Sequence, residues 1–398
     1  MTANPRTLLT GPDRAVLPGQ PATATGKQIL PRAAPSISTR ALNRATLSRQ
    51  RLLERQDVSA EAMLRHLIGL QGQVHKAPYI GLWTRLRHFK AADLEDLLTG
   101  RRAVRATMMR VTLHVAMAED FLAIRPLVES AALRGFRTNH LKPLKGLDPE
   151  EIRRASRALL DDETLSPAQL GKRLQLRWPE ISAIDLSMVA RFLEPVVHVP
   201  PAGLWAATKA PELTSVKRWL GREPEAMAVS ALALRYLAAF GPASGKDFST
   251  WSGVVGGAAV MEGLRPQLVS FIAEDGREVF DLPNATRPDA DVAAPPRLLP
   301  PYDNVILGYE DRRRMLSAEA FRGLWLGNGL NPAFTVDGFV KGTWKLTEGK
   351  GSARIVLSRF EPIAKTDEAG LKREAAALLR RFLPTSTPEL VLKDFERP

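Results

Sequence analysis

Two glutamines separated by a single residue carry the strongest chemical signal in this sequence. Gln71 and Gln73 follow an apolar run, residues 63–70, and precede residues 74–78, Val-His-Lys-Ala-Pro. A neutral amide can hold a water molecule, or meet a developing positive charge, without ionising. It accepts a proton poorly, so a pair of amides suits a bond that is already activated. The triplet alone is a weak signal, because glutamine is also common as a solvent-facing residue at a helix end.

Composition narrows the classes of protein in which such a pair could act. The 398 residues are 44% apolar, which predicts a globular chain of two to four units. Lys and Arg exceed Asp and Glu by 56 − 43 = 13, an excess that favours a polyanionic partner such as nucleic acid. Cysteine is absent, and the six histidines form no pair at helical metal-ligand spacing. We therefore expect neither a metal nor another cofactor.

The lengths of the apolar runs and the composition of the N-terminal residues indicate where the protein acts. No apolar run approaches the roughly 20 residues of a bilayer helix, which predicts a cytoplasmic protein without a membrane anchor. Residues 1–38 are rich in Pro, Thr, Ala and Gly and contain four basic residues, so we expect a disordered basic tail that adds nonspecific affinity for DNA.

The glutamine pair falls inside a first helical unit, residues 39–140. Apolar periodicity predicts a helix through residue 56, Ser59 is a candidate cap for a second helix, and a third ends at Gly100. The following stretch is rich in β-branched residues and predicts paired strands. A basic hairpin behind helices is typical of a winged helix, whose wing grips the DNA duplex. The candidate DNA-binding residues of this hairpin are Arg101, Arg102, Arg105 and Arg110.

The same order of helices and strands recurs downstream. We expect a second winged-helix unit over residues 141–222, with Ser166 opening a capping box, and a third over residues 223–294 with a turn at Asp275-Gly276. After Pro295-Pro296 the pattern alternates as strands and then ends in one amphipathic helix, which predicts a small β-barrel-like domain over residues 295–398. A single irregular α+β domain is the alternative, because the repeat rests on element order alone.

Six short motifs in one order resemble the winged-helix DNA glycosylases of the AlkZ and YcaQ family, bacterial proteins that remove alkylated purines and unhook interstrand crosslinks. The likeness extends from about residue 40 to the C-terminus. The motifs occupy residues 67–73 with 77–79, residues 109–114, residues 200–205, residues 247–251, residues 299–304 and residues 336–344.

The resemblance implies an α+β fold of three tandem winged-helix units and a C-terminal β-barrel, curved around a basic DNA channel. It also implies that Gln71 and Gln73 are the catalytic residues, since the family motif is Gln, any residue, then Gln or Asp. By the same analogy His114 lies near the lesion and contacts DNA. The alternative is a buried, hydrogen-bonded histidine, because His114 follows the apolar Leu113. Gly72 departs slightly from the pattern, in which the middle residue is usually apolar.

These residues suit a monofunctional glycosylase acting on N7-alkylated purines in double-stranded DNA. Such a base already carries a positive charge and leaves without being protonated. We assign the placing of water to Gln73 and contact with the sugar or water to Gln71.

Two other functions use the same DNA contacts: a winged-helix transcriptional regulator and a damage-binding protein without catalysis. The protein is expected to act as a monomer at the nucleoid with no obligate protein partner. Resistance to a secreted alkylating compound and general repair would leave the same motif, so the sequence does not identify the lesion.

Overall fold

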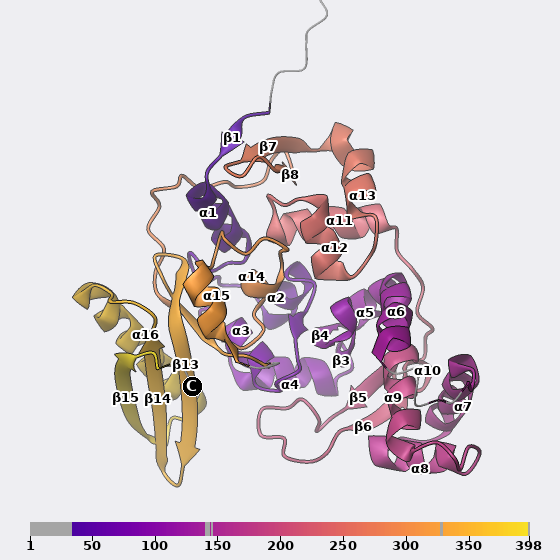
Figure 1. Cartoon of the computed structure of the whole chain (residues 1–398). Helices are drawn as coiled ribbons and strands as arrows, with labels where there is room; N and C mark the ends of the chain where they lie inside the picture. Colours follow the sequence, from indigo (N-terminus) through magenta and orange to yellow (C-terminus); the bar gives the residue numbers. More distant parts are fainter. Residues whose placement is uncertain (1–33, 140–143, 145, 327–328, 397–398) are drawn as a thin grey trace, which may run out of the picture. The chain divides into compact units, whose positions relative to one another are not determined.

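Helices and strands are mixed throughout the computed structural model, which describes residues 34–139, 144, 146–326 and 329–396 (Figure 1). The predicted α+β class is confirmed. Residue contacts divide the chain after Ala34, and every feature below belongs to the unit Pro35–Pro398. Within the described residues, no helix combines the length and apolar character that a membrane span requires.

The predicted basic tail lies almost wholly outside the described residues. Its last residues are ordered: strand β1 (Ser36–Ile37) pairs in parallel with β7, and Ser38 caps helix α1 (Thr39–Arg49) by accepting a hydrogen bond from the Ala41 N–H. This helix ends seven residues before the predicted residue 56. It ends early because Arg51 adopts a left-handed φ of 57°, which a right-handed helix cannot contain.

The first segment contains the predicted hairpin and one helix that periodicity missed. Ser59 caps the second helix through a bond from the Ala62 N–H, and Gly100 ends the fourth, as predicted. The unpredicted helix, α3, begins with a proline in its first turn, where the missing N–H costs no hydrogen bond. The elements after α1 are α2 (Ala60–His66), β2 (Leu70–Gln71), α3 (Ala77–Trp83), α4 (Ala91–Thr99), β3 (Ala103–Thr107), the 3-10 turn η1 (Met109–Val111) and β4 (Leu113–Met117).

Two further segments repeat the order of helices followed by strands. Ser166 forms the predicted capping box with Gln169, and the turn at Asp275-Gly276 joins two antiparallel strands. That the chain has three units, and that each is a winged helix, stays a prediction. The elements are α5 (Ala118–Ile124), α6 (Glu129–Asn139), α7 (Pro149–Asp162), α8 (Pro167–Gln175), α9 (Ala183–Leu193), β5 (Val196–Val199), β6 (Glu212–Ser215), α10 (Val216–Leu220), α11 (Val229–Phe240), α12 (Gly245–Ser252), α13 (Gly257–Leu264), β7 (Val269–Ala273) and β8 (Glu278–Asp281).

The strands of the first two segments join in one sheet, which the sequence did not predict. Its order is β2-β4-β3-β5-β6. Strand β3 pairs antiparallel with β5, with Arg105 opposite His198, and β2 pairs with the other side of the hairpin at β4. The sheet therefore brings the first residue of the glutamine triplet and a strand of the second segment to the same hairpin.

The C-terminal strands form an open sheet, which corrects the predicted barrel. Its order is β15-β14-β13-β12-β9, so β9 and β15 are edges. The chain reaches β15 through a long helix, and this crossover sets β15 parallel to β14. The elements are β9 (Arg297–Leu299), α14 (Asn304–Leu307), α15 (Ala318–Leu324), β10 (Trp325–Leu326), β11 (Gly329–Leu330), β12 (Ala333–Val336), β13 (Phe339–Gly349), β14 (Ser352–Arg359), α16 (Lys365–Phe382) and β15 (Thr387–Asp394).

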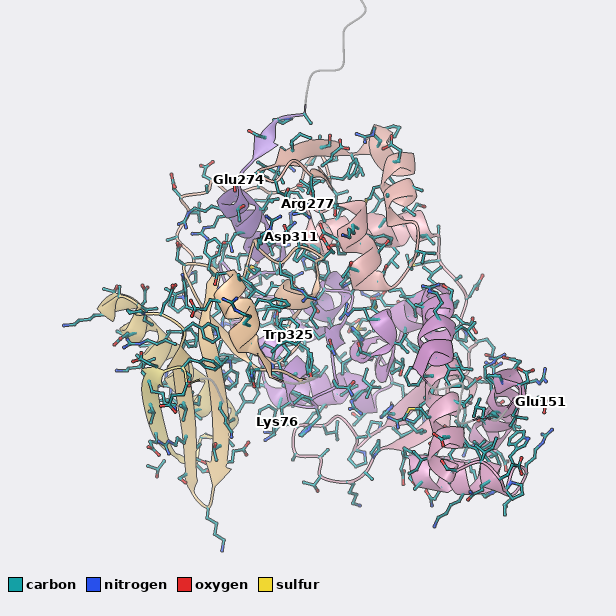
Figure 2. All side chains as sticks on the ribbon, viewed as in Figure 1. Lys76, Glu151, Glu274, Arg277, Asp311 and Trp325 are labelled. Carbon is teal, nitrogen blue, oxygen red and sulfur yellow. The ribbon has the colours of Figure 1, made fainter. Side chains whose placement is uncertain are left out.

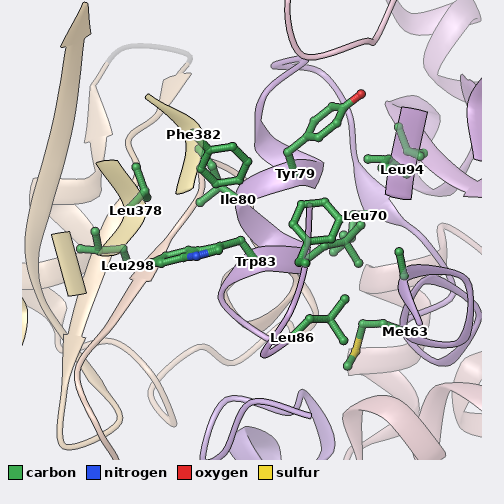
Figure 3. Close-up of a cluster of buried hydrophobic side chains, with 14 of the residues drawn as sticks. Met63, Leu70, Tyr79, Ile80, Trp83, Leu86, Leu94, Leu298, Leu378 and Phe382 are labelled. Atoms are coloured by element: carbon green, nitrogen blue, oxygen red, sulfur yellow. The ribbon is translucent and has the colours of Figure 1, made fainter. Parts of the chain in front are cut away.

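Helix α3 is buried between the first segment and the C-terminal sheet. Figure 3 shows Trp83 of α3 between Leu298 of β9 and the rest of the first segment, and its ring centroid lies 6.4 Å from that of Phe382 in α16. Every residue of α3 is buried. Because α3 begins four residues after Gln73, this core fixes the chain on one side of the glutamine triplet.

Ion pairs attach the hairpin of the third segment to the C-terminal part of the chain. Arg277, which follows the turn between β7 and β8, pairs with Asp275 at 2.6 Å and with Asp311 beyond α14 (Figure 2). The guanidinium groups of Arg277 and Arg313 hold the pKa of the Asp311 carboxyl below its ordinary value even though burial acts in the opposite direction.

Candidate active site

The two glutamines lie at the end of a short strand and in the loop after it. Gln71 is the last residue of β2, opposite His114 of β4, and only 6% of it is exposed. Gln73 lies in the following loop, is exposed, and has no hydrogen-bond partner among the described residues. The pair therefore consists of one fixed amide and one free amide.

Arg110 fixes the orientation of the Gln71 amide. This residue, at the hairpin tip with a left-handed φ of 54°, donates to the Trp251 carbonyl at 2.7 Å and approaches the Gln71 Oε1 atom at 3.4 Å. A guanidinium has only donors, so the amide oxygen must face Arg110. The amide NH2 group of Gln71 is then free to donate elsewhere. Burial lowers the pKa of Arg110 to about 10, which leaves it charged at neutral pH.

Arg105 holds the residue between the glutamines. Its Nε atom donates to the Gly72 carbonyl at 3.1 Å, and its terminal nitrogen donates to the His198 Nδ1 atom at 2.9 Å. Because His198 accepts at Nδ1, its proton is on Nε2. Burial, with the nearby charges of Arg105 and Arg191, lowers the pKa of His198 to about 3, so the ring is neutral.

His114 is part of the protein interior. Only 1% of it is exposed, and its Nδ1 atom donates to the Thr112 carbonyl at 2.9 Å. Burial and the neighbouring charge of Arg110 lower its pKa to about 3. His114 thus supports β4 opposite Gln71 as a neutral ring, and its burial is at odds with the predicted contact with DNA.

A cavity of about 430 Å³ joins the two glutamines to residues from three other parts of the chain. We call it the glutamine cavity. None of the described residues that line it is a carboxylate. Its walls are Gln71, Gln73, Thr107, Val111, Thr112, Leu113, Met188, Arg191, Phe192, His198 and Tyr302.

Comparison with known proteins identifies the family to which this chain belongs. A family model described as DNA glycosylase AlkZ-like matches residues 64–381, a stretch that begins before Gln71 and ends within α16. The chain belongs to the AlkZ-like DNA glycosylase family. It is accordingly a glycosylase, an enzyme whose substrate is DNA.

A solved structure agrees with the family assignment at the level of fold. The DNA glycosylase AlkZ of Streptomyces sahachiroi is similar with a TM-score of 0.72, over 90% of this chain and 100% of that chain, at 18% sequence identity. At that identity the likeness shows a shared α+β fold. No curated protein sequence matches the chain significantly.

The other two candidate DNA-binding arginines of this AlkZ-like chain lie at the opposite end of the hairpin from the glutamines. Arg101 and Arg102 precede β3 and are exposed. The Arg101 guanidinium stacks 4.3 Å from the Trp219 ring centroid, and Arg102 pairs with Glu61 at 2.8 Å. Their exposure keeps them candidates for DNA contact. Arg105, in contrast, is buried and donates a hydrogen bond to the Gly72 carbonyl. Its position therefore does not favour direct contact with a phosphate.

Sequence reasoning missed several walls of the glutamine cavity. Met188, Arg191 and Phe192 come from α9 in the second segment, where amphipathic spacing gave no sign of a site. Tyr302 was part of the fifth family motif and has a left-handed φ of 62°, so the motif was a usable signal. Its neighbour Asp303 caps α14 and forms a buried ion pair with Arg85, in keeping with a turn residue.

Proposed function

We propose that this chain is a monofunctional DNA glycosylase that hydrolyses the N-glycosidic bond of N7-alkylated purines in double-stranded DNA, without a cofactor. Gln73 places the attacking water, and Gln71 contacts the sugar. The proposal includes three winged-helix units that form a basic DNA channel, and a monomer as the active form.

The chemistry of the glutamine cavity is the observation that carries this proposal. Among the described residues its walls contain two amides and no carboxylate, and His198 is neutral with a pKa of about 3. A site of this kind offers neither a carboxylic acid nor an imidazolium to protonate an ordinary, uncharged base. An N7-alkylated purine needs none, because the departing base takes the bonding electrons and becomes neutral. Fixed dipoles and a placed water complete the reaction.

The contact of Arg110 with Gln71 supports the division of roles. Since the Gln71 oxygen faces Arg110 at 3.4 Å, its NH2 group is the part left to bind an oxygen of the sugar or backbone. Gln73 is exposed and unpaired among the described residues, so its oxygen is available to accept a hydrogen bond from water. Water held there adds to C1′ as the base departs, and the extra proton that it then carries passes to solvent.

Bulky adducts and interstrand crosslinks are included among the proposed substrates. A glycosylase that encloses a flipped base excludes lesions larger than its pocket. Here one of the two amides is exposed, which suits a lesion that stays outside a closed pocket.

The test is base release from a defined lesion. A duplex with one N7-methylguanine is incubated with the protein and then heated in alkali, which breaks the strand wherever the base is lost. We expect breaks at the lesion with the wild type and at least a hundredfold fewer with the Gln71→Ala, Gln73→Ala double variant, at unchanged affinity for the duplex. A nitrogen mustard crosslink tests the larger lesion in the same assay.

The pH profile supplies a second measurement. The rate should show no steep limb between about pH 6 and 9, because the pKa values of His114 and His198 are about 3 and that of Arg110 is about 10. Binding without base release would favour a shielding protein, and selection of one undamaged sequence would favour a regulator. Either result would overturn the proposal.

A further inference from the structure

Arg191 places a positive charge in the wall of the glutamine cavity from a different segment of the chain. It lies on α9, one helical turn after Met188, and both side chains line the cavity with Gln71 and Gln73. Arg191 is half-buried. Among the described residues it has neither an ion pair nor a hydrogen bond, unlike Arg105 and Arg110.

The charge of Arg191 is not compensated by a nearby acid. Burial alone lowers its pKa, with no carboxylate acting to raise it. The acid closest in sequence, Glu194, is bound to Arg157 at 2.7 Å and to Arg153 at 3.2 Å on α7. The Arg191 charge in turn lowers the pKa of Arg105 and of His198. A partly desolvated guanidinium without a partner among the described residues, beside the two amides, has the chemistry to bind an anion.

The chemistry of the substrate limits which anion this is. A bare guanidinium near the sugar would oppose the positive charge that develops there as the base departs. A bound phosphodiester cancels that opposition and places a negative charge beside the sugar. The planar fork of a guanidinium also matches the two free oxygens of a phosphodiester.

We propose that Arg191 binds the phosphodiester adjacent to the damaged nucleotide and so sets the position of its sugar against Gln71 and Gln73. The apolar side chain of Met188 forms the neighbouring wall. This inference rests on the proposed function, because it takes the glutamine cavity to be where the lesion nucleotide is bound. It adds a substrate-binding residue outside the glutamine motif.

Binding experiments test the inference without requiring catalysis. The full chain is titrated with a duplex that contains a tetrahydrofuran abasic-site analogue, at several salt concentrations. Arg191→Gln should bind roughly tenfold more weakly, as expected when a charge-assisted hydrogen bond is lost. The slope of log affinity against log salt should fall by about 0.9, the value for one phosphate. Arg191→Lys should keep the slope.

Arg154→Gln is the matched control. Arg154 is an exposed residue of α7 in the same segment, and it does not line the glutamine cavity. Its replacement removes the same charge from the protein, so an effect of net charge alone would appear equally in both variants. We expect the affinity of Arg154→Gln for the abasic-site duplex to stay within about twofold of the wild type.

Replacing one phosphate at a time with a neutral group identifies the phosphate that Arg191 contacts. Methylphosphonate in place of the phosphate on one side of the abasic site should weaken wild-type binding roughly tenfold, and should weaken Arg191→Gln binding no further. A wild type insensitive to methylphosphonate on both sides would overturn the inference, even if Arg191→Gln proved unstable. Failure to release N7-methylguanine would overturn the proposed function but would leave the phosphate contact to be judged by these titrations.

Discussion

At the scale of single residues, Arg105 ties the loop between Gln71 and Gln73 to strand β5. It joins the Gly72 carbonyl to His198 across strands β3 and β5, and its guanidinium is buried. Replacing it with glutamine would leave both partners without their donor and the loop less fixed. We expect Arg105→Gln to lower the rate of base release at saturating DNA roughly tenfold, with the salt dependence of DNA binding unchanged.

Arg102→Gln is the contrasting variant for that prediction. Arg102 is exposed at the far end of the hairpin, so its loss should reduce the salt slope by about 0.9 if it contacts a phosphate, at an unchanged rate. Rates and salt slopes are measured on one N7-methylguanine duplex. A reduced slope for Arg105→Gln would show that Arg105 contacts DNA after all, as the sequence first suggested.

The family motif singled out the glutamines, but nothing in the sequence indicated the surroundings of the arginines. Gln71 and Gln73 both line one cavity. That they are catalytic stays a prediction. Arg105 and Arg110 were predicted to face DNA because no acid lies near them in sequence. Their actual partners are the carbonyl groups of Gly72 and Trp251, and backbone carbonyls have no signature in the order of residues.

At the scale of elements, two glycines bracket the short strand that carries Gln71. Gly69 has a φ of 98°, and a Cβ atom there would lie 3.0 Å from the Ala116 Cβ and 3.1 Å from the Val115 carbonyl oxygen. Gly69→Ala should therefore destabilise the protein by about 2 kcal/mol and displace β2 from β4. We expect a lower midpoint of urea unfolding and a loss of base release.

Gly72→Ala is the comparison for this strand. Its φ is outside the left-handed region, and a Cβ would lie 3.3 Å from the Val115 Cγ2 atom and in ordinary contact, at 3.5 Å, with the backbone of His114 and Val115. The stability of this variant should stay within about 1 kcal/mol of the wild type, with activity retained. Equal losses in the two variants would show that the strained backbone of Gly69 is not what sets the position of β2.

The elements that sequence predicted well are those with local signals. The caps at Ser59 and Ser166 and the turn at Asp275-Gly276 each depend on side chains within a few residues. Helix α3 is buried on every side, so it has no polar face to give periodicity. Strand β2 is two residues long, which is too short for an alternation of apolar and polar residues. It forms because its backbone pairs with the edge of strand β4.

At the scale of the whole molecule, buried neutral histidines make stability depend on pH. The pKa values of His114 and His198 fall from an ordinary 6.5 to about 3 in the folded protein. Between these values the unfolded chain binds protons that the folded protein does not, so stability is complete above pH 6.5 and falls as the pH is lowered. From pH 7.5 to pH 5 the loss is about 2 kcal/mol for each histidine.

Urea unfolding at pH 7.5 and pH 5 measures this loss. His198→Gln keeps an acceptor for Arg105 and should reduce the loss of stability between these pH values by about 2 kcal/mol. His88→Gln, at an exposed histidine, should leave that dependence as it is. Identical pH dependence in the wild type and His198→Gln would mean that His198 is protonated in the folded state.

Long-range pairing lay beyond prediction from the sequence. The order of helices and strands indicated separate units, yet β3 and β5 belong to one sheet. The C-terminal strands alternate as a barrel would, and only the strand order, with β9 and β15 at the two edges, shows that the sheet stays open. The alternation of apolar and polar residues shows which face of a strand is buried. Whether a sheet closes into a barrel depends instead on whether its two edge strands pair.

The sheet shared by the first two segments has a consequence for how such chains can change. Repeated modules are commonly gained or exchanged one at a time, but a gene fragment cut between these two would strip β5 from β3 and bare a strand edge prone to self-association. The first two segments must then be inherited or transferred together. New lesion preferences would arise more readily by altering side chains on α9 than by shuffling whole repeats.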